Sequence, residues 1–139
     1  MYTEYWTKEH IKELTIEEQS AWFDAYNHGL EMDRGYYLDK MSKQTSQVLK
    51  NNIEKEYLKY LKQLTEDKNF LFYTILLNEE KRIISLCRLM KRENTIYISG
   101  LETHRDYRQR GFAKQVLVET IKHAFELGYD SIHSPQALL

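Results

Sequence analysis

One α/β domain with a mixed β-sheet is the fold class that this sequence predicts, and three observations predict it. The middle of the chain holds three consecutive strand-like segments joined by short polar turns, which is typical of an antiparallel meander. Helix-like segments with an apolar stripe precede and follow this meander. A glycine-containing turn leads from the third strand into the last helix, and a further short strand follows that helix. A strand, a connecting helix and a second strand usually make a parallel pair, so we expect a mixed sheet with helices on both faces.

Size and composition limit the classes of protein to which the chain can belong. With 139 residues it is expected to be a single domain, residues 1–139. A formal net charge of −1 gives no electrostatic reason to expect binding to nucleic acid or to a membrane surface. No apolar run approaches the roughly 20 residues of a membrane span. The one cysteine, Cys87, cannot form an internal disulfide, which fits a reducing compartment, so we expect a cytoplasmic protein. Because Cys87 falls on a predicted core strand, we expect it to be a buried side chain rather than a nucleophile. The five histidines show no metal-binding spacing, so no metal site is expected.

The first elements follow from local patterns. The alternation of apolar and polar residues over His10–Leu14 predicts a short first strand. Thr15 and Glu18 form a capping box, which predicts a helix from about Ile16 to Asn27 that ends near Gly29. Its aromatic residues are expected to be partly buried: Trp22, Phe23 and Tyr26.

A turn and a long helix come next. Asp33-Arg34-Gly35 indicates a turn, and Tyr36 and Tyr37 follow it. From Ser42 or Lys43 to about Leu64, the spacing of three and four residues between apolar side chains predicts the longest helix. Its apolar stripe consists of Leu49, Ile53, Tyr57, Tyr60, Leu61 and Leu64.

The meander follows from Phe70. The continuous apolar run Phe70–Leu77 predicts a buried strand, and Arg82–Met90 and Thr95–Glu102 predict the second and third strands. The polar segments 78–81 and 91–94 predict the turns between them. Gly100 interrupts the third strand, and a glycine there often marks a bulge or a close approach of a ligand.

The last helix is expected from Phe112 to Leu127, with Gly128 at its C-terminal cap and a final short strand over Tyr129–Ser134. Its apolar positions are Phe112, Val116, Leu117, Ile121, Ala124 and Phe125.

The turn that precedes this helix is the most informative segment of the chain. A strand that turns through small residues into a helix can leave several backbone N–H groups unpaired and directed at one point. Such groups, together with the helix dipole, attract a phosphate. Gly111 has no Cβ, and the basic residues of the segment outnumber its one acid, Asp106. These basic residues are Arg105, Arg108, Arg110 and Lys114. Several successive amides suit a pyrophosphate better than a single small anion, although a tight turn with solvated arginines and a mononucleotide or simple anion site are alternatives.

The run Arg108-Gln109-Arg110-Gly111-Phe112-Ala113 resembles motif A of the GCN5-related N-acetyltransferases (GNAT), whose signature is Q/R-x-x-G-x-G/A. The order of elements from His10 to Ser134 is also similar to that of the family. The resemblance implies a GNAT-like fold and the transfer of an acetyl group from acetyl-CoA, the cosubstrate, to a primary amine of a small molecule or a peptide. The transfer would occur by direct attack, without a covalent enzyme intermediate.

The resemblance also implies roles for particular residues. The pyrophosphate would rest on the amides of Gln109 to Ala113, and the pantetheine arm would lie along Leu101 and Thr103. The full set implied for cofactor binding is Leu101, Thr103, Arg108, Gln109, Arg110, Gly111, Phe112, Ala113 and Lys114. The attacking amine must lose a proton. Glu102 is a candidate acceptor because family members often place a glutamate on this strand, and His104 is a second candidate because its intrinsic pKa is suitable.

The sequence departs from the family pattern in three ways. Arg105 stands where the family commonly has proline, and Thr103 where it commonly has an apolar residue. Family members normally continue past the last strand with a helix that carries a tyrosine and with a closing hairpin, whereas here no tyrosine follows Tyr129. A C-terminally shortened fold is therefore expected, with an unpaired sheet edge that a second copy of the chain would cover in a homodimer. The alternative to an active enzyme is a catalytically impaired module that binds CoA or dimerises. In the family, the region of Asp33, Arg34, Tyr36 and Tyr37 shapes the acceptor pocket.

Overall fold

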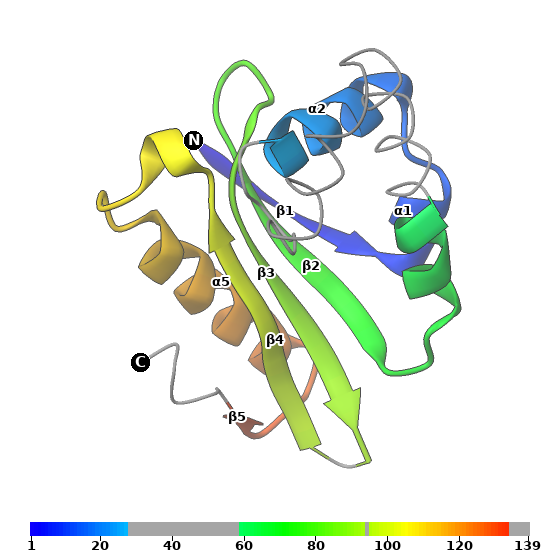
Figure 1. Cartoon of the computed structure of the whole chain (residues 1–139). Helices are drawn as coiled ribbons and strands as arrows, with labels where there is room; N and C mark the ends of the chain where they lie inside the picture. The colour runs from blue at the N-terminus through cyan, green and yellow to red at the C-terminus, as the bar shows by residue number, and fades with distance from the viewer. Residues whose placement is uncertain (28–58, 94, 134–139) are drawn as a thin grey trace, which may run out of the picture.

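The computed structural model describes residues 1–27, 59–93 and 95–133 (Figure 1). The described elements, in chain order, are β1 (Tyr2–Thr7), α1 (Lys8–Lys12), α2 (Ile16–Asn27), β2 (Phe70–Leu77), β3 (Ile83–Arg92), β4 (Thr95–Thr103), the 3-10 helix η1 (Arg105–Tyr107), α5 (Phe112–Glu126) and β5 (Ile132–His133). Residues 59–66 are helical as well. No helix in these ranges is long and apolar enough to cross a membrane.

The described strands form one mixed sheet in the order β1-β2-β3-β4-β5. Neighbours from β1 to β4 are antiparallel, and β5 lies parallel to β4. Figure 1 shows α1 and α2 on one face of the sheet and α5 on the other. The prediction of a mixed α/β fold with a meander, a parallel pair and helices on both faces is therefore confirmed.

The predicted first strand at His10–Leu14 is wrong, because α1 occupies Lys8–Lys12 and the first strand is Tyr2–Thr7. The apolar residues Ile11 and Leu14 lie three positions apart, which is a helical spacing, whereas the period of two in a strand would put them on opposite faces. Ile11 is buried on α1. Thr7 decides the boundary, since its Oγ1 accepts a hydrogen bond from the backbone N–H of His10 at 3.3 Å and caps the helix.

The capping box that predicts α2 is present. The Glu18 N–H donates to Thr15 Oγ1 at 3.1 Å, and the Thr15 N–H donates to Glu18 Oε1 at 3.0 Å. Phe23 is partly buried, as predicted, whereas Trp22 is buried more completely than predicted. The burial of Tyr26 lies outside what the structure describes. The helical residues 59–66 agree with the end of the predicted long helix but run past Leu64. Gly29, the turn at 33–35, Tyr36, Tyr37 and the start of that helix lie outside the described residues.

The meander matches its prediction closely. β2 has the predicted bounds, whereas β3 and β4 are shifted or extended by one or two residues at their ends. Lys91 and Arg92 are exposed, so the apolar pattern ends at Met90, although backbone pairing continues to Arg92 opposite Thr95. In the turn after β2, Asn78 Oδ1 accepts hydrogen bonds from the N–H groups of Glu80 (2.9 Å) and Arg82 (3.0 Å).

Each face of the sheet carries a hydrophobic core. The core under α1, α2 and residues 59–66 includes Trp6, Ile11, Trp22, Leu61, Tyr73 and Leu86. The core under α5 includes Phe72, Ile84, Cys87, Leu89, Val116 and Ala124. Cys87 is fully buried, which confirms its interpretation as a core side chain.

The interruption predicted at Gly100 is a bulge in β4. Arg88 pairs with Gly100 and Leu89 with Ile98, so Ser99 is the extra residue on this strand. Within the described residues, β5 begins later than predicted, with Ile132 and His133 paired, and Ser134 lies outside the described residues. Because the β4–β5 pairing stops at Tyr97, the rest of β4 has no described strand on that side.

Candidate active site

The turn between β4 and α5 has the backbone shape that the sequence predicts for a phosphate site. η1 follows β4, and the chain then passes through Gln109 (φ 64°) and Gly111 (φ 82°) before α5 begins at Phe112. Both residues are in the left-handed region, which glycine adopts without strain. Gly111 is the N-cap of α5, and no side chain caps this helix terminus.

The backbone amides of this turn have no acceptor among the described residues. The first helical hydrogen bond at this end of α5 is donated by the Gln115 N–H to the Gly111 carbonyl at 3.1 Å. None of the hydrogen bonds found in the described ranges is donated by the backbone N–H of residues 108–114. No atom lies within 4 Å of the place where a Cβ on Gly111 would stand, so the space above its backbone is open. Unpaired amides at an open helix N-terminus fit the diphosphate of a nucleotide cofactor.

The charge around these amides is positive. Arg105, Arg108, Arg110 and Lys114 are all exposed. Asp106 pairs with Arg105 at 3.8 Å, but no carboxylate of the described residues forms an ion pair with Arg108, Arg110 or Lys114. The Arg110 guanidinium lies 5.6 Å from the centre of the Tyr107 ring, and Arg108 Nε donates to the Thr103 carbonyl at 3.1 Å. The turn and the start of α5 therefore carry three cations that have no acidic partner in the described part of the chain.

The open edge of β4 leads to this turn. Leu101 and Thr103, which the resemblance places along the pantetheine arm, are half-buried on the part of β4 that pairs with β3 and has no described strand on its other side. Leu101 packs against the core under α5. The Thr103 hydroxyl lies 3.0 Å from Ser85 Oγ, and its carbonyl accepts from Arg108, so Thr103 already has protein partners on both groups.

The two candidate proton acceptors have different surroundings. Glu102 pairs across the strands with Leu86, which belongs to the core under α1 and α2. Because directly paired residues share a face, the half-buried Glu102 side chain is on the α2 face of the sheet, opposite α5. His104 is fully buried and caps η1, because its Nδ1 accepts a hydrogen bond from the Asp106 N–H at 3.1 Å. The His104 and Tyr107 rings pack in a T-shaped arrangement with centroids 5.2 Å apart. This structural role of His104 was not foreseen from the sequence.

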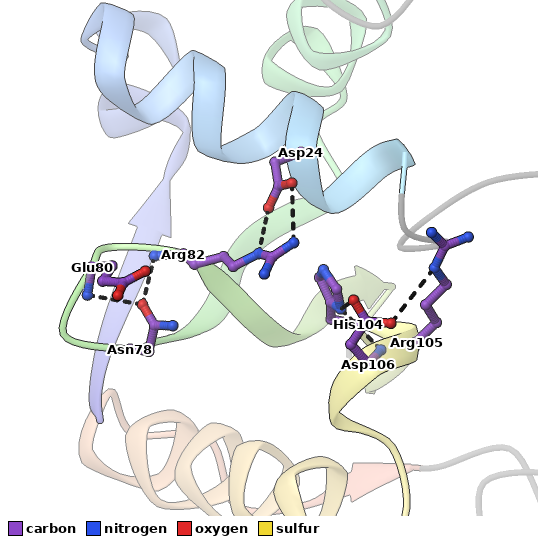
Figure 2. A network of polar contacts seen from close by, with 7 residues as sticks. All are labelled: Asp24, Asn78, Glu80, Arg82, His104, Arg105 and Asp106. Carbon is purple, nitrogen blue, oxygen red and sulfur yellow. Dashed lines mark hydrogen bonds and ion pairs between the residues drawn. The ribbon is translucent and has the colours of Figure 1, made fainter.

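A polar contact that sequence reasoning missed joins α2 to the β2–β3 hairpin beside this turn. Arg82 donates to both carboxylate oxygens of Asp24, from Nε at 2.8 Å and from Nη2 at 3.3 Å. Hydrogen bonding to Asp24, and further contact with Tyr107, raise the pKa of the Arg82 guanidinium above its ordinary value. Figure 2 shows Arg82 reaching beneath Asp24 toward the side on which His104 lies. No local pattern could reveal this pair, because its members are 58 residues apart.

Comparison with known proteins agrees with this geometry. The model of the acetyltransferase (GNAT) family matches residues 3–135. A GNAT family acetyltransferase from Staphylococcus aureus is similar in structure with a TM-score of 0.61 and 16% identity, over 98% of this chain and 87% of that one. A GNAT family N-acetyltransferase from Escherichia coli, solved in complex with CoA, has a TM-score of 0.58 and 14% identity over 96% of this chain.

This chain spans only 61% of the Escherichia coli protein. An aminoglycoside 6′-N-acetyltransferase from Acinetobacter haemolyticus has a TM-score of 0.58 and 14% identity, over 99% of this chain and 81% of that one. Identities this low show a common fold. The search of curated proteins found no match. The family match, which covers almost the whole chain and includes the turn at Gly111, shows that this protein belongs to the GNAT acetyltransferase family.

Proposed function

We propose that this protein transfers the acetyl group of acetyl-CoA to a primary amine by direct attack of the amine on the thioester. The family assignment supports acetyl transfer. The observation that carries the proposal is that no described residue accepts a hydrogen bond from the backbone amides of residues 108–114, in a turn that is exposed at Gly111 and carries three basic side chains, Arg108, Arg110 and Lys114. These groups match the charge and the several acceptor oxygens of a diphosphate.

The cofactor would lie across two adjoining surfaces. The amides of Gln109 to Ala113 would hold the pyrophosphate, with Arg108, Arg110 and Lys114 adding positive charge. The pantetheine arm would follow the edge of β4 past Thr103 and Leu101, where no described strand lies on the β5 side and backbone groups could bond its amides as a neighbouring strand would. The Thr103 carbonyl already accepts from Arg108, so other backbone groups of this segment would make these bonds.

Glu102 would accept the proton of the attacking amine. Acetyl-CoA supplies an activated thioester, whose C–S bond breaks as the new C–N bond forms and whose sulfur leaves as a thiolate. Glu102 stands next to Leu101 on the same strand, and its side chain is on the α2 face of the sheet. An amine approaching from that face would meet the carboxylate directly or through one water. His104 is the weaker candidate because its Nδ1 is used to cap η1.

A small-molecule amine is the acceptor class that we propose. Several structurally similar proteins are aminoglycoside acetyltransferases, one of them solved in complex with sisomicin. Their likeness supports the class and not a particular compound. We also propose a homodimer, because β5 has β4 on one side and no described strand on the other. Light scattering at micromolar concentration tests the dimer, and a monomer would contradict it.

Release of free thiol from acetyl-CoA over a panel of amines tests the function. The wild-type protein should release thiol with at least one amine. Arg110→Glu combined with Gly111→Asp should abolish release, because it places two negative charges at the phosphate site. Glu102→Gln should lower kcat by roughly 10²-fold or more while CoA binding stays unchanged, as expected for a general base.

The alternative, a CoA-binding module without turnover, predicts a different result. It predicts that CoA raises the melting temperature but that no amine in the panel promotes thiol release. A melting temperature that saturating CoA leaves unchanged would contradict both functions.

A further inference from the structure

Three side chains that commonly bind metals meet at the N-terminal end of the fold. They are Glu4 on β1, His10 on α1 and Glu18 on α2, and each is half-buried. One ligand atom from each lies within 4.8 Å of the other two. None of the three belongs to the proposed acetyl-CoA site.

Neighbouring groups orient these side chains. Glu4 Oε2 accepts a hydrogen bond from Trp6 Nε1 at 2.9 Å. Glu18 Oε1 accepts from the Thr15 N–H, so its Oε2 faces His10 Nε2 at 2.5 Å. The His10 ring stacks on Trp6 with centroids 5.0 Å apart. Outer partners of this kind hold metal ligands in the geometry that binding requires.

We propose that Glu4, His10 and Glu18 bind a divalent transition-metal ion of the zinc type. Imidazole nitrogens and carboxylate oxygens both bind Zn²⁺, with bond lengths of about 2.0 to 2.2 Å. Ligand atoms on a tetrahedral ion are then about 3.4 Å apart, so atoms within 4.8 Å need side-chain movements of only about 1 Å. Two carboxylates and a neutral imidazole also compensate the charge of the ion.

The site has a path to solvent. A cavity of about 210 Å³ is lined by Glu4 and Glu18, together with Thr15, Glu17 and Lys81, and Lys81 pairs with Glu17 at 3.8 Å. A water in this cavity can fill the fourth position of a tetrahedral ion.

This proposal replaces the expectation of no metal site, which rested on the spacing of histidines alone. The site uses one histidine, and its carboxylates come from two other elements. Only the packing of β1, α1 and α2 brings the three together. A bound ion would link these elements and stabilise the N-terminal part of the sheet.

Calorimetric titration of the whole chain with ZnCl₂ tests the proposal. We expect one strong site, and His10→Gln should weaken it at least tenfold. Glu4→Gln and Glu18→Gln should also weaken it at least tenfold, and both are conservative. Glutamine at 4 keeps an acceptor for Trp6, and glutamine at 18 keeps the capping box.

His123→Gln is the matched control. His123 also pairs with a carboxylate, Glu126 at 3.6 Å, but it belongs to no group of three ligands among the described residues. This variant should bind Zn²⁺ like the wild type. The proposal is overturned if the wild type shows no heat of binding, if affinity survives in all three site variants, or if His123→Gln lowers it equally. Melting curves recorded with a chelator show whether each variant folds without metal. If His10→Gln does not fold, Glu18→Gln decides.

Discussion

Replacement of Gly111 by alanine tests the phosphate site most directly, and Gly128→Ala is its matched control. Both glycines have positive φ, 82° and 97°, and no atom lies within 4 Å of an added Cβ at either one. They stand at opposite ends of α5. The two substitutions therefore introduce the same backbone strain without a steric clash, and only one of them alters the proposed site.

The expected loss of stability is similar for the two variants. The left-handed conformation costs an alanine roughly 1 to 2 kcal/mol. Alanine also reduces the entropy of the unfolded chain, which returns about 0.4 to 1 kcal/mol. We expect each variant to lose about 1 kcal/mol of unfolding free energy in urea denaturation.

The expected effect on cofactor affinity differs between them. The Cβ at Gly111 projects into the open space that a phosphate must enter, so at least one charge-assisted hydrogen bond is lost. Such a bond contributes roughly 1.5 to 3 kcal/mol, which corresponds to a rise in the Kd for CoA of about 10- to 150-fold. Gly128→Ala should leave the Kd unchanged. Calorimetric titration with CoA measures both values. If Gly111→Ala binds CoA as tightly as the wild type, the amides of this turn do not hold the diphosphate.

Three further predictions concern stability. Thr15→Ala removes the hydroxyl that caps α2 and should lower the unfolding free energy by about 1 kcal/mol in urea denaturation; no change would mean that the Thr15–Glu18 capping box contributes nothing. Leu89→Ala creates a cavity at a fully buried position under α5 and should lower the unfolding free energy by about 2 to 5 kcal/mol. A loss below about 1 kcal/mol would contradict the burial of Leu89 in this core. Because the folded protein lowers the pKa of Glu18, this group contributes stability above its unfolded pKa and loses it as the pH falls through the folded value. In melting curves recorded without metal at a series of pH values, Glu18→Gln should therefore be less stable than the wild type near neutral pH, and its stability should approach that of the wild type under acid conditions. A difference in melting temperature that is the same at every pH would contradict this prediction.

The elements that the sequence predicted correctly are those with a strong local signal. The capping box marked the start of α2, and the continuous apolar run marked β2 to the residue. The glycine in β4 marked a bulge, because an interruption of the strand pattern has a local backbone cause. The first strand was misassigned because Ile11 and Leu14, three positions apart, have a helical spacing and not the alternation of a strand; the first strand is Tyr2–Thr7, which pairs with β2.

In the candidate site too, features with a local cause could be predicted from the sequence, and features that depend on packing could not. The turn around Gly111 could be predicted, since a phosphate site made of backbone amides depends on a short segment and on one residue without a Cβ. The burial of His104 and its capping of η1 could not be predicted, because burial depends on the packing of Tyr107 and of strands distant in sequence. The face on which Glu102 lies depends on the register of β4 against β3, which a bulge shifts by one residue.

By itself, the sequence determined the order of the meander, the helix starts and the phosphate-binding turn, because caps, periodicity and glycine conformation act over a few residues. Only the tertiary structure decided which distant side chains meet. It brought Arg82 to Asp24 between the β2–β3 hairpin and α2, and it gathered Glu4, His10 and Glu18 from three elements. These contacts follow from how the helices pack on the sheet, and packing is set by the whole hydrophobic core rather than by any one segment.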